Sequence, residues 1–133
     1  MNDIEKMTLK SQEAMQAAAK MAEDRGHSAV EPEHLFYQLL RQEEGLVPDL
    51  IQSAGGNLQG LMKDFDVALS RMPQVSGSSR RVIASPRLVK VFEGAEREAR
   101  AMEDEYISTE HFLLAVLADA GPDLKKLLTQ NQT

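Results

Sequence analysis

Apolar residues recur at spacings of three and four along most of the chain, which places them on one face of a helix. The first such stretch begins at Thr8, which can cap the helix, and Gly26 ends it. Residues 27–30 form a short extended link. Pro32 then takes the first position of a second predicted helix, which Gly45 ends.

Two further helices are predicted in this half of the chain. Pro48 opens the third, which a glycine pair closes, and Asn57 caps the fourth, which Pro73 breaks. Residues 73–84 carry proline, glycine and several serines without helical periodicity. That composition predicts a linker or a surface loop.

The helical pattern then starts again. Ser85 caps a long helix that begins with Pro86, and residues 104–107 form a second extended link. Ser108 caps the next helix. The last predicted helix carries Leu124, Leu127 and Leu128.

The second half of the chain repeats the first. A shift of 77 positions superposes the two halves without a gap, and caps, apolar stripes and a Glu-His pair coincide in one register. Shared features in one register favour an internal duplication. The superposed residues include Thr8 with Ser85, Ala18 with Ala95, Glu33-His34 with Glu110-His111, and Leu50-Ile51 with Leu127-Leu128.

This pattern predicts an all-α fold, an orthogonal-type helical bundle in one domain over residues 1–133. We expect two tandem pseudo-symmetric repeats of about four helices each: repeat one at 8–72, a linker at 73–84 and repeat two at 85–133. The second repeat is truncated, because it stops where its own fourth helix should begin. We therefore expect the chain to be part of a longer protein.

Composition narrows the classes of function. Hydrophobic residues make up 42% and aromatic residues 5%, a balance that suits helix-on-helix packing. Without cysteine, the chain forms no disulfide and no thiolate metal site. A net charge of −6 argues against nucleic acid as a partner. Neither a signal peptide nor a long apolar run is present, so we expect no membrane partner and a cytoplasmic location.

Three segments, residues 17–40, 71–77 and 85–117, carry a family resemblance. The second helix of each half starts with a Glu-His pair, as Glu-Pro-Glu-His in the first half and Ser-Thr-Glu-His in the second, and the whole resembles the Clp N-terminal repeat. That repeat precedes the ATPase domains of the ClpA, ClpB and ClpC unfoldases. The link RMPQVSG into a Ser-Pro helix is most similar to the ClpB type.

The resemblance implies a substrate-recognition module of a hexameric, ATP-dependent disaggregase or unfoldase. Such a module binds unfolded or aggregated proteins weakly at the pore entrance, and adaptor proteins are further possible partners. ATP and Mg would belong to the ATPase domains of the parent protein. This chain has no GxxxxGK[ST] loop and no hydrolase motif, so we expect neither catalytic residues nor a cofactor here.

The resemblance also points to individual residues. In ClpB-like domains, residues at the positions of Thr8, Asp104 and Glu110 are linked to substrate handling. Tyr106 lies beside the two acids in the sequence, and we expect Phe92 and His111 to line an apolar groove where the repeats meet. The alternative is that Thr8 is only a helix cap and that the acids are solvated.

The two Glu-His pairs allow several interpretations. Both lie in the first turn of a helix, where a carboxylate is stabilised by the helix dipole, and His27 is the third histidine. We favour first-turn stabilisation and packing over a metal site, because metal sites need converging ligands. ClpC-like relatives imply another possibility, in which Glu33 and Glu110 receive phosphorylated arginine.

Methionine is abundant, with seven residues. Flexible methionine side chains suit either a plastic binding surface or the filling of a core. Helical spacing favours the core. The methionines expected there are Met7, Met15, Met21, Met62 and Met102.

Overall fold

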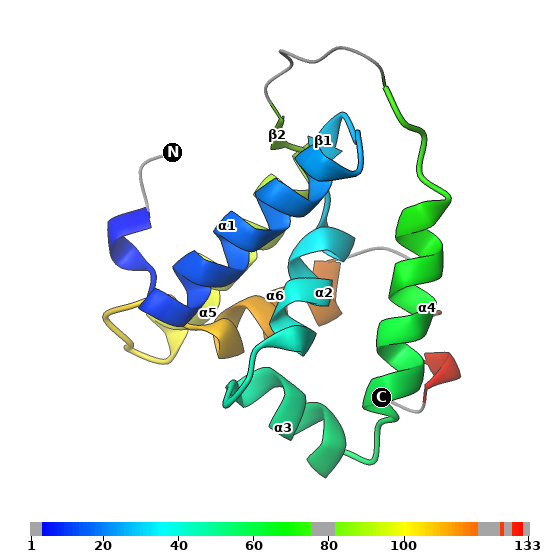
Figure 1. Ribbon diagram of the computed structural model, residues 1–133. Coiled ribbons are helices and arrows are strands. Elements are labelled where there is room, and N and C mark those ends of the chain that lie inside the picture. The colour runs from blue at the N-terminus through cyan, green and yellow to red at the C-terminus, as the bar shows by residue number, and fades with distance from the viewer. Residues whose placement is uncertain (1–3, 76–81, 120–125, 127–128, 132–133) are drawn as a thin grey trace.

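The computed structural model describes residues 4–75, 82–119, 126 and 129–131. Within these ranges the fold is helical, as predicted, with two very short strands (Figure 1). The elements are η1 (Ile4–Lys6), α1 (Leu9–Asp24), β1 (Ala29–Val30), α2 (Pro32–Arg41), α3 (Leu46–Ser53), α4 (Leu58–Ser70), β2 (Ile83–Ala84), α5 (Pro86–Ala101) and α6 (Thr109–Asp119). The predicted helix with Leu124, Leu127 and Leu128 falls outside the described residues.

Helix starts follow the predicted caps. The side chains of Thr8 and Ser85 accept hydrogen bonds from backbone N–H groups three residues later, and Asn57 does the same for α4. Pro32 and Pro86 occupy the first turns of α2 and α5, where a missing N–H costs no helical hydrogen bond. Local sequence signals therefore determine where these helices begin.

The boundary between α2 and α3 differs from the prediction. Helix α2 ends at Arg41, and Gly45 is the N-cap of α3 and not the end of α2. Pro48 consequently lies inside the first turn of α3, two residues after its start at Leu46. The fold tolerates this because the first backbone N–H groups of a helix have no helical acceptor.

The end of the predicted linker joins the two halves. Strand β2 pairs in parallel with β1, with Val30 opposite Ala84, and the Ser85 N–H donates to the Val30 carbonyl at 3.0 Å. Met7 and Ile107 form the matching parallel bridge, each lying 77 positions from its counterpart in the first pair. The two halves therefore exchange equivalent backbone contacts around a pseudo-twofold relation.

Buried side chains from both halves form one continuous core. Phe36 meets Phe65 edge-on at 5.2 Å between ring centroids, and Phe92 meets Phe112 in the same manner at 5.5 Å. Figure 1 shows α4 along one side of the molecule, next to α2. In the described ranges, no helix combines the length and the apolar character needed to cross a membrane.

The methionine prediction is correct in part. Met7 and Met21 are buried, and Met15 and Met62 pack partly buried against the core. Met102 is 45% exposed, contrary to the prediction. It is the C-cap of α5, where the chain leaves the helix and no longer follows its buried face.

Candidate functional site

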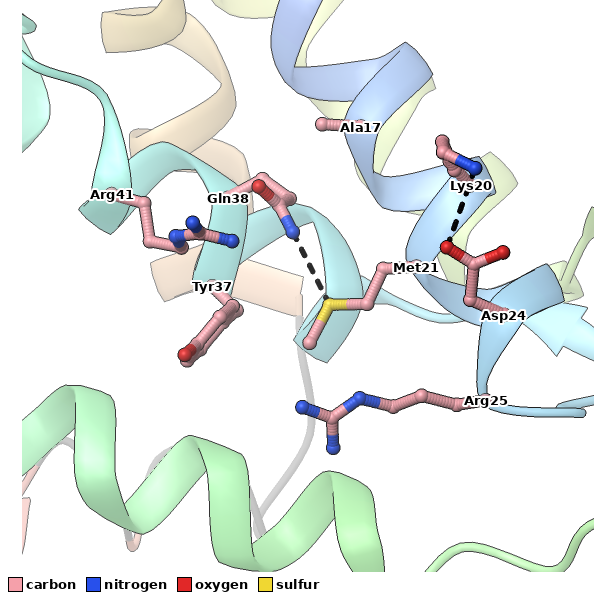
Figure 2. Close-up of a pocket in the computed structure, with 8 residues that line it drawn as sticks. All are labelled: Ala17, Lys20, Met21, Asp24, Arg25, Tyr37, Gln38 and Arg41. Atoms are coloured by element: carbon pink, nitrogen blue, oxygen red, sulfur yellow. Dashed lines mark hydrogen bonds and ion pairs between the residues drawn. The ribbon is translucent and has the colours of Figure 1, made fainter.

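Most of the candidate residues lie outside the cavities of the molecule. A groove between α1 and α2 contains none of the residues predicted for binding (Figure 2). A shallow depression of about 210 Å³ contains Asp104, together with Ile107 from the link before α6. Five of the predicted residues lie instead in the link before α6 or in the first turns of α2 and α6: Glu33, Asp104, Tyr106, Glu110 and His111.

His34 and His111 perform the same task in the two halves. The Nδ1 atom of His34 accepts a hydrogen bond from the backbone N–H of Glu31 at 2.9 Å, and that of His111 accepts one from Ser108 at 2.8 Å. Both imidazoles are buried. These hydrogen bonds stabilise the first turns of α2 and α6. The sequence analysis favoured this structural role over metal binding.

The second nitrogen of each imidazole has a different partner. His34 Nε2 lies 2.8 Å from Nδ1 of buried His27, whereas His111 Nε2 lies 2.8 Å from Oδ2 of Asp104. His27 and Asp104 occupy equivalent positions, 77 residues apart. One half thus carries a buried His-His pair where the other carries a His-Asp pair.

Burial sets the charge state of the His-His pair. Desolvation is the main reason that the pKa of His34 falls to about 4, and repulsion of a charged His34 ring by the nearby His27 and Arg25 lowers it further. The pKa of His27 is also lowered, mainly by burial. Both rings are therefore neutral at pH 7, and the pair is held by one shared hydrogen bond.

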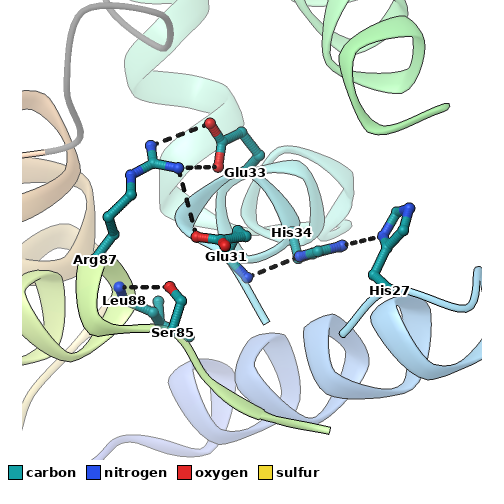
Figure 3. A network of polar contacts seen from close by, with 7 residues as sticks. All are labelled: His27, Glu31, Glu33, His34, Ser85, Arg87 and Leu88. Carbon is teal, nitrogen blue, oxygen red and sulfur yellow. Dashed lines mark hydrogen bonds and ion pairs between the residues drawn. The ribbon is translucent and has the colours of Figure 1, made fainter. Parts of the chain in front are cut away.

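Glu33 is not an exposed acid. Its side chain is 8% exposed and receives two hydrogen bonds from the guanidinium of Arg87, at 3.3 and 3.1 Å (Figure 3). Arg87 also contacts Glu31 at 3.4 Å. Because Arg87 lies in the first turn of α5, this bidentate pair joins the two halves.

Glu110 occupies the position in α6 that Glu33 occupies in α2, but its surroundings differ. Its side chain is half-buried and has no hydrogen-bond or ion-pair partner among the described residues. The residue equivalent to Arg87 is Lys10, whose ammonium instead donates to the carbonyl of Glu43 at 3.1 Å. Within the described part of the chain, the carboxylate of Glu110 is therefore left unpaired.

A backbone hydrogen bond connects Thr8 to the link before α6, the helix that carries Glu110. The Thr8 N–H donates to the carbonyl of Ile107 at 3.0 Å, and the Thr8 hydroxyl caps α1. Two exposed apolar side chains flank this bridge: Leu9 is 75% exposed and Tyr106 is 51% exposed. Exposed apolar groups and an unpaired carboxylate are the kinds of group that bind a chain carrying both apolar and basic side chains.

The prediction that Phe92 and His111 line an apolar groove is wrong, because both side chains are buried. Phe92 is 6% exposed and packs on Phe112 in the core, and His111 is 1% exposed. Neither side chain lines a surface, because the apolar face of α5 packs against α6. The depression that does contain Asp104 is lined mostly by charged residues and does not include Glu110. Its lining is Lys6, Glu96, Ala99, Arg100, Asp104, Glu105 and Ile107.

Sequence reasoning missed Arg87 and the partnership of His27. The signal for His27 was present, since His27 and Asp104 align at the 77-residue shift and each precedes its histidine by seven positions. No comparable pattern marked Arg87. Within the described ranges, no three histidine or acidic side chains are placed to hold a metal ion.

Curated relatives of this chain are ClpB chaperones. The chaperone protein ClpB of Bdellovibrio bacteriovorus is 43% identical over 126 residues, which is 95% of this chain and 15% of the relative. The ClpB of Clostridium tetani is 35% identical over 129 residues, with 95% and 15% covered. The chain thus spans about 15% of the length of these relatives.

Solved structures share the fold. The N-terminal domain of Hsp104 from Candida albicans superposes with a TM-score of 0.84 at 18% identity, covering 94% of this chain and 81% of that one. The N-domain of ClpV in complex with a VipB peptide has a TM-score of 0.82 at 22% identity, covering 98% and 81%. The family described as the Clp repeat N-terminal domain matches residues 6–131. The chain therefore belongs to the Clp repeat N-terminal domain family.

Proposed function

We propose that this chain is the substrate-recognition module of a ClpB-type, ATP-dependent disaggregase. In this proposal it binds unfolded or aggregated polypeptides weakly at the pore entrance of a cytoplasmic hexamer. The parent's ATPase domains would supply ATP and Mg chemistry, and this chain would hold no cofactor. The observation that carries the proposal is the carboxylate of Glu110, which is half-buried and unpaired among the described residues.

The internal duplication indicates what Glu110 would bind. In the first repeat, the equivalent carboxylate of Glu33 receives the guanidinium of Arg87. Glu110 has the same place in its helix, yet the residue equivalent to Arg87 is turned to another acceptor. We infer that an arginine or lysine of a bound polypeptide supplies the missing cation.

Leu9 and Tyr106 would add apolar contact. Both side chains are exposed, and each residue is next in the chain to one of the two bridged residues, Thr8 and Ile107. Two side chains bury little area, and an unfolded chain loses entropy when it is ordered. Binding at this site is therefore expected to be weak, with a preference for segments that combine basic and apolar residues.

Asp104 would act as a positioning residue and as a secondary contact. One of its oxygens accepts from His111, which in turn holds the first turn of α6 and hence Glu110. Its side chain is 46% exposed, so the carboxylate also adds negative charge to the surface. We expect loss of this acid to weaken binding less than loss of Glu110.

A permanently unfolded, fluorescently labelled protein tests the proposal. We would measure its binding to this chain by anisotropy and compare Glu110→Gln with Glu93→Gln, an exposed acid on α5 that changes the net charge equally. Glu110→Gln should weaken binding by about threefold to tenfold, and Glu93→Gln by less than about twofold. Equal affinities for both variants and the unmodified chain would remove Glu110 from the proposal.

A second candidate function is docking of one defined partner, and the peptide complex of the ClpV N-domain favours it. In this alternative the chain serves as an adaptor-docking or phosphoarginine-reading module. Glu33 is already engaged by Arg87, so only one of the two acidic positions could receive phosphoarginine. Parallel titrations with an arginine peptide and its phosphoarginine form decide between the two: clear preference for the modified peptide supports reading, and equal affinity excludes it.

A further inference from the structure

Lys10 occupies, at the start of α1, the place that Arg87 occupies at the start of α5. The two residues lie 77 positions apart, which is the shift that relates the repeats. Arg87 reaches from α5 to Glu33 of α2 (Figure 3). The same relation connects Lys10 of α1 with Glu110 of α6. Lys10 is thus the chain's own counterpart of the cation that we propose for Glu110.

The backbone holds both pairs of helix starts in the same way. The Thr8 N–H donates to the Ile107 carbonyl at 3.0 Å, and the Ser85 N–H donates to the Val30 carbonyl at the same distance. The side chains of Thr8 and Ser85 also cap their helices through equivalent bonds. Each cation follows its cap by two residues. The lysine therefore starts from the point from which the arginine reaches its glutamate.

In the structure, the Lys10 ammonium has another acceptor. It donates to the carbonyl of Glu43 at 3.1 Å, and its side chain is exposed. The carboxylate of Glu110 has no hydrogen-bond or ion-pair partner among the described residues. A hydrogen bond to a carbonyl and an exposed ion pair each contribute little free energy, so the two acceptors compete for the ammonium. Exchange between them needs only a rotamer change of an exposed side chain.

The first repeat has arginine where the second pair has lysine, and this difference sets how firmly the glutamate is held. A guanidinium offers two N–H groups to a carboxylate, as Arg87 does to Glu33 at 3.3 and 3.1 Å. An ammonium is a point charge without this fork and is more strongly hydrated. A guanidinium of another chain therefore displaces an ammonium from a carboxylate more readily than a second ammonium does.

We propose that Lys10 is an intramolecular competitor for Glu110 and makes that site selective for arginine. The inference rests on the proposed function, in which Glu110 binds a cation of an unfolded polypeptide. Without a polypeptide, the Lys10 ammonium exchanges between the Glu110 carboxylate and the Glu43 carbonyl. An arginine of the polypeptide takes the carboxylate and leaves Lys10 on the carbonyl, where the structure places it. A lysine of the polypeptide has no such advantage over Lys10 and binds more weakly.

Two fluorescently labelled peptides test the selectivity by anisotropy. Both carry leucine, serine and glycine around a single basic residue, which is arginine in one peptide and lysine in the other. The unmodified chain should bind the arginine peptide about threefold more tightly than the lysine peptide. Lys10→Arg keeps the charge but supplies the fork, so it should weaken the arginine peptide by about threefold to tenfold. The matched control Lys90→Arg, at an exposed site on α5, should change affinity by less than about twofold.

The carboxyl carbon signal of Glu110 in NMR gives a second readout that needs no peptide. Lys10→Arg should shift this signal, and Lys90→Arg should leave it in place. An unshifted signal would overturn the role of Lys10, and so would an affinity for the arginine peptide that Glu110→Gln lowers but Lys10→Arg does not. Equal affinities of the unmodified chain for the two peptides would remove the selectivity for arginine. Equal binding of the arginine peptide by Glu110→Gln and the unmodified chain would instead refute the proposed function, and the competition with it.

Discussion

Lowering the pH from 7 to 5 should destabilise this chain through the His27–His34 pair. The hydrogen bonds assign one proton to each ring. The Glu31 N–H occupies Nδ1 of His34, so the His34 proton sits on Nε2 and is donated to Nδ1 of His27. A second proton on His34 Nδ1 would point at the Glu31 N–H, and one on His27 Nδ1 would point at the His34 Nε2–H. Protonation therefore breaks a hydrogen bond inside the core.

The sign and size of the effect follow from the pKa of His34. This pKa is about 4 in the folded chain, against an ordinary value of 6.5 for a solvated histidine, so the folded state disfavours the charged ring. The resulting stability is fully present above pH 6.5 and is lost as the pH falls toward 4. The difference corresponds to about 3 kcal/mol in total, of which about 2 kcal/mol is lost by pH 5.

Urea denaturation at pH 7, 6 and 5 measures this loss. The matched variant is His27→Asp, which copies the His-Asp pair of Asp104 and His111. An aspartate favours the charged form of His34, so the variant should lose much less stability over the same interval. Unchanged stability of the original chain between pH 7 and 5, or identical losses in both proteins, would refute the reasoning.

Two further substitutions test features of the duplication. Glu103 has a left-handed backbone with φ 57°, at the position where the first repeat has Gly26. Glycine adopts this conformation without strain, so Glu103→Gly should raise the free energy of unfolding by about 1 kcal/mol, measured by urea denaturation. A loss of stability would show that the side chain is needed there. Arg87→Ala removes the cation from buried Glu33 and should cost about 1–3 kcal/mol, with most of the loss recovered by adding Glu33→Gln. Additive losses in the double variant would contradict the pairing.

Helix positions were predictable because their signals are local. Thr8, Asn57 and Ser85 each cap a helix through a bond to a backbone N–H only three residues away. The boundary at Gly45 was not predictable in the same way. Glycine is common at both ends of helices, and the choice between ending α2 and starting α3 depends on how the two helices pack.

The candidate site was predictable only in outline. The register of the duplication placed Glu110 opposite Glu33, but it could not show that Arg87 neutralises one of them, since that contact spans 54 residues. The burial of Phe92 was the more avoidable error. It lies on the same helical stripe as Leu88 and Ala95, and the stripe of an amphipathic helix faces the core.

The two repeats differ in whether their equivalent glutamates have a partner within the molecule. In the first, Glu33 and His34 are satisfied by side chains of the same molecule, Arg87 and His27. In the second, Glu110 has no such partner among the described residues. The backbone bonds at the two bridges, Ser85 to Val30 and Thr8 to Ile107, are equivalent, so the side chains make the difference at these positions. The first repeat thus uses its carboxylate within the fold, and in the proposed function the second repeat offers the equivalent carboxylate to a cation of a bound polypeptide.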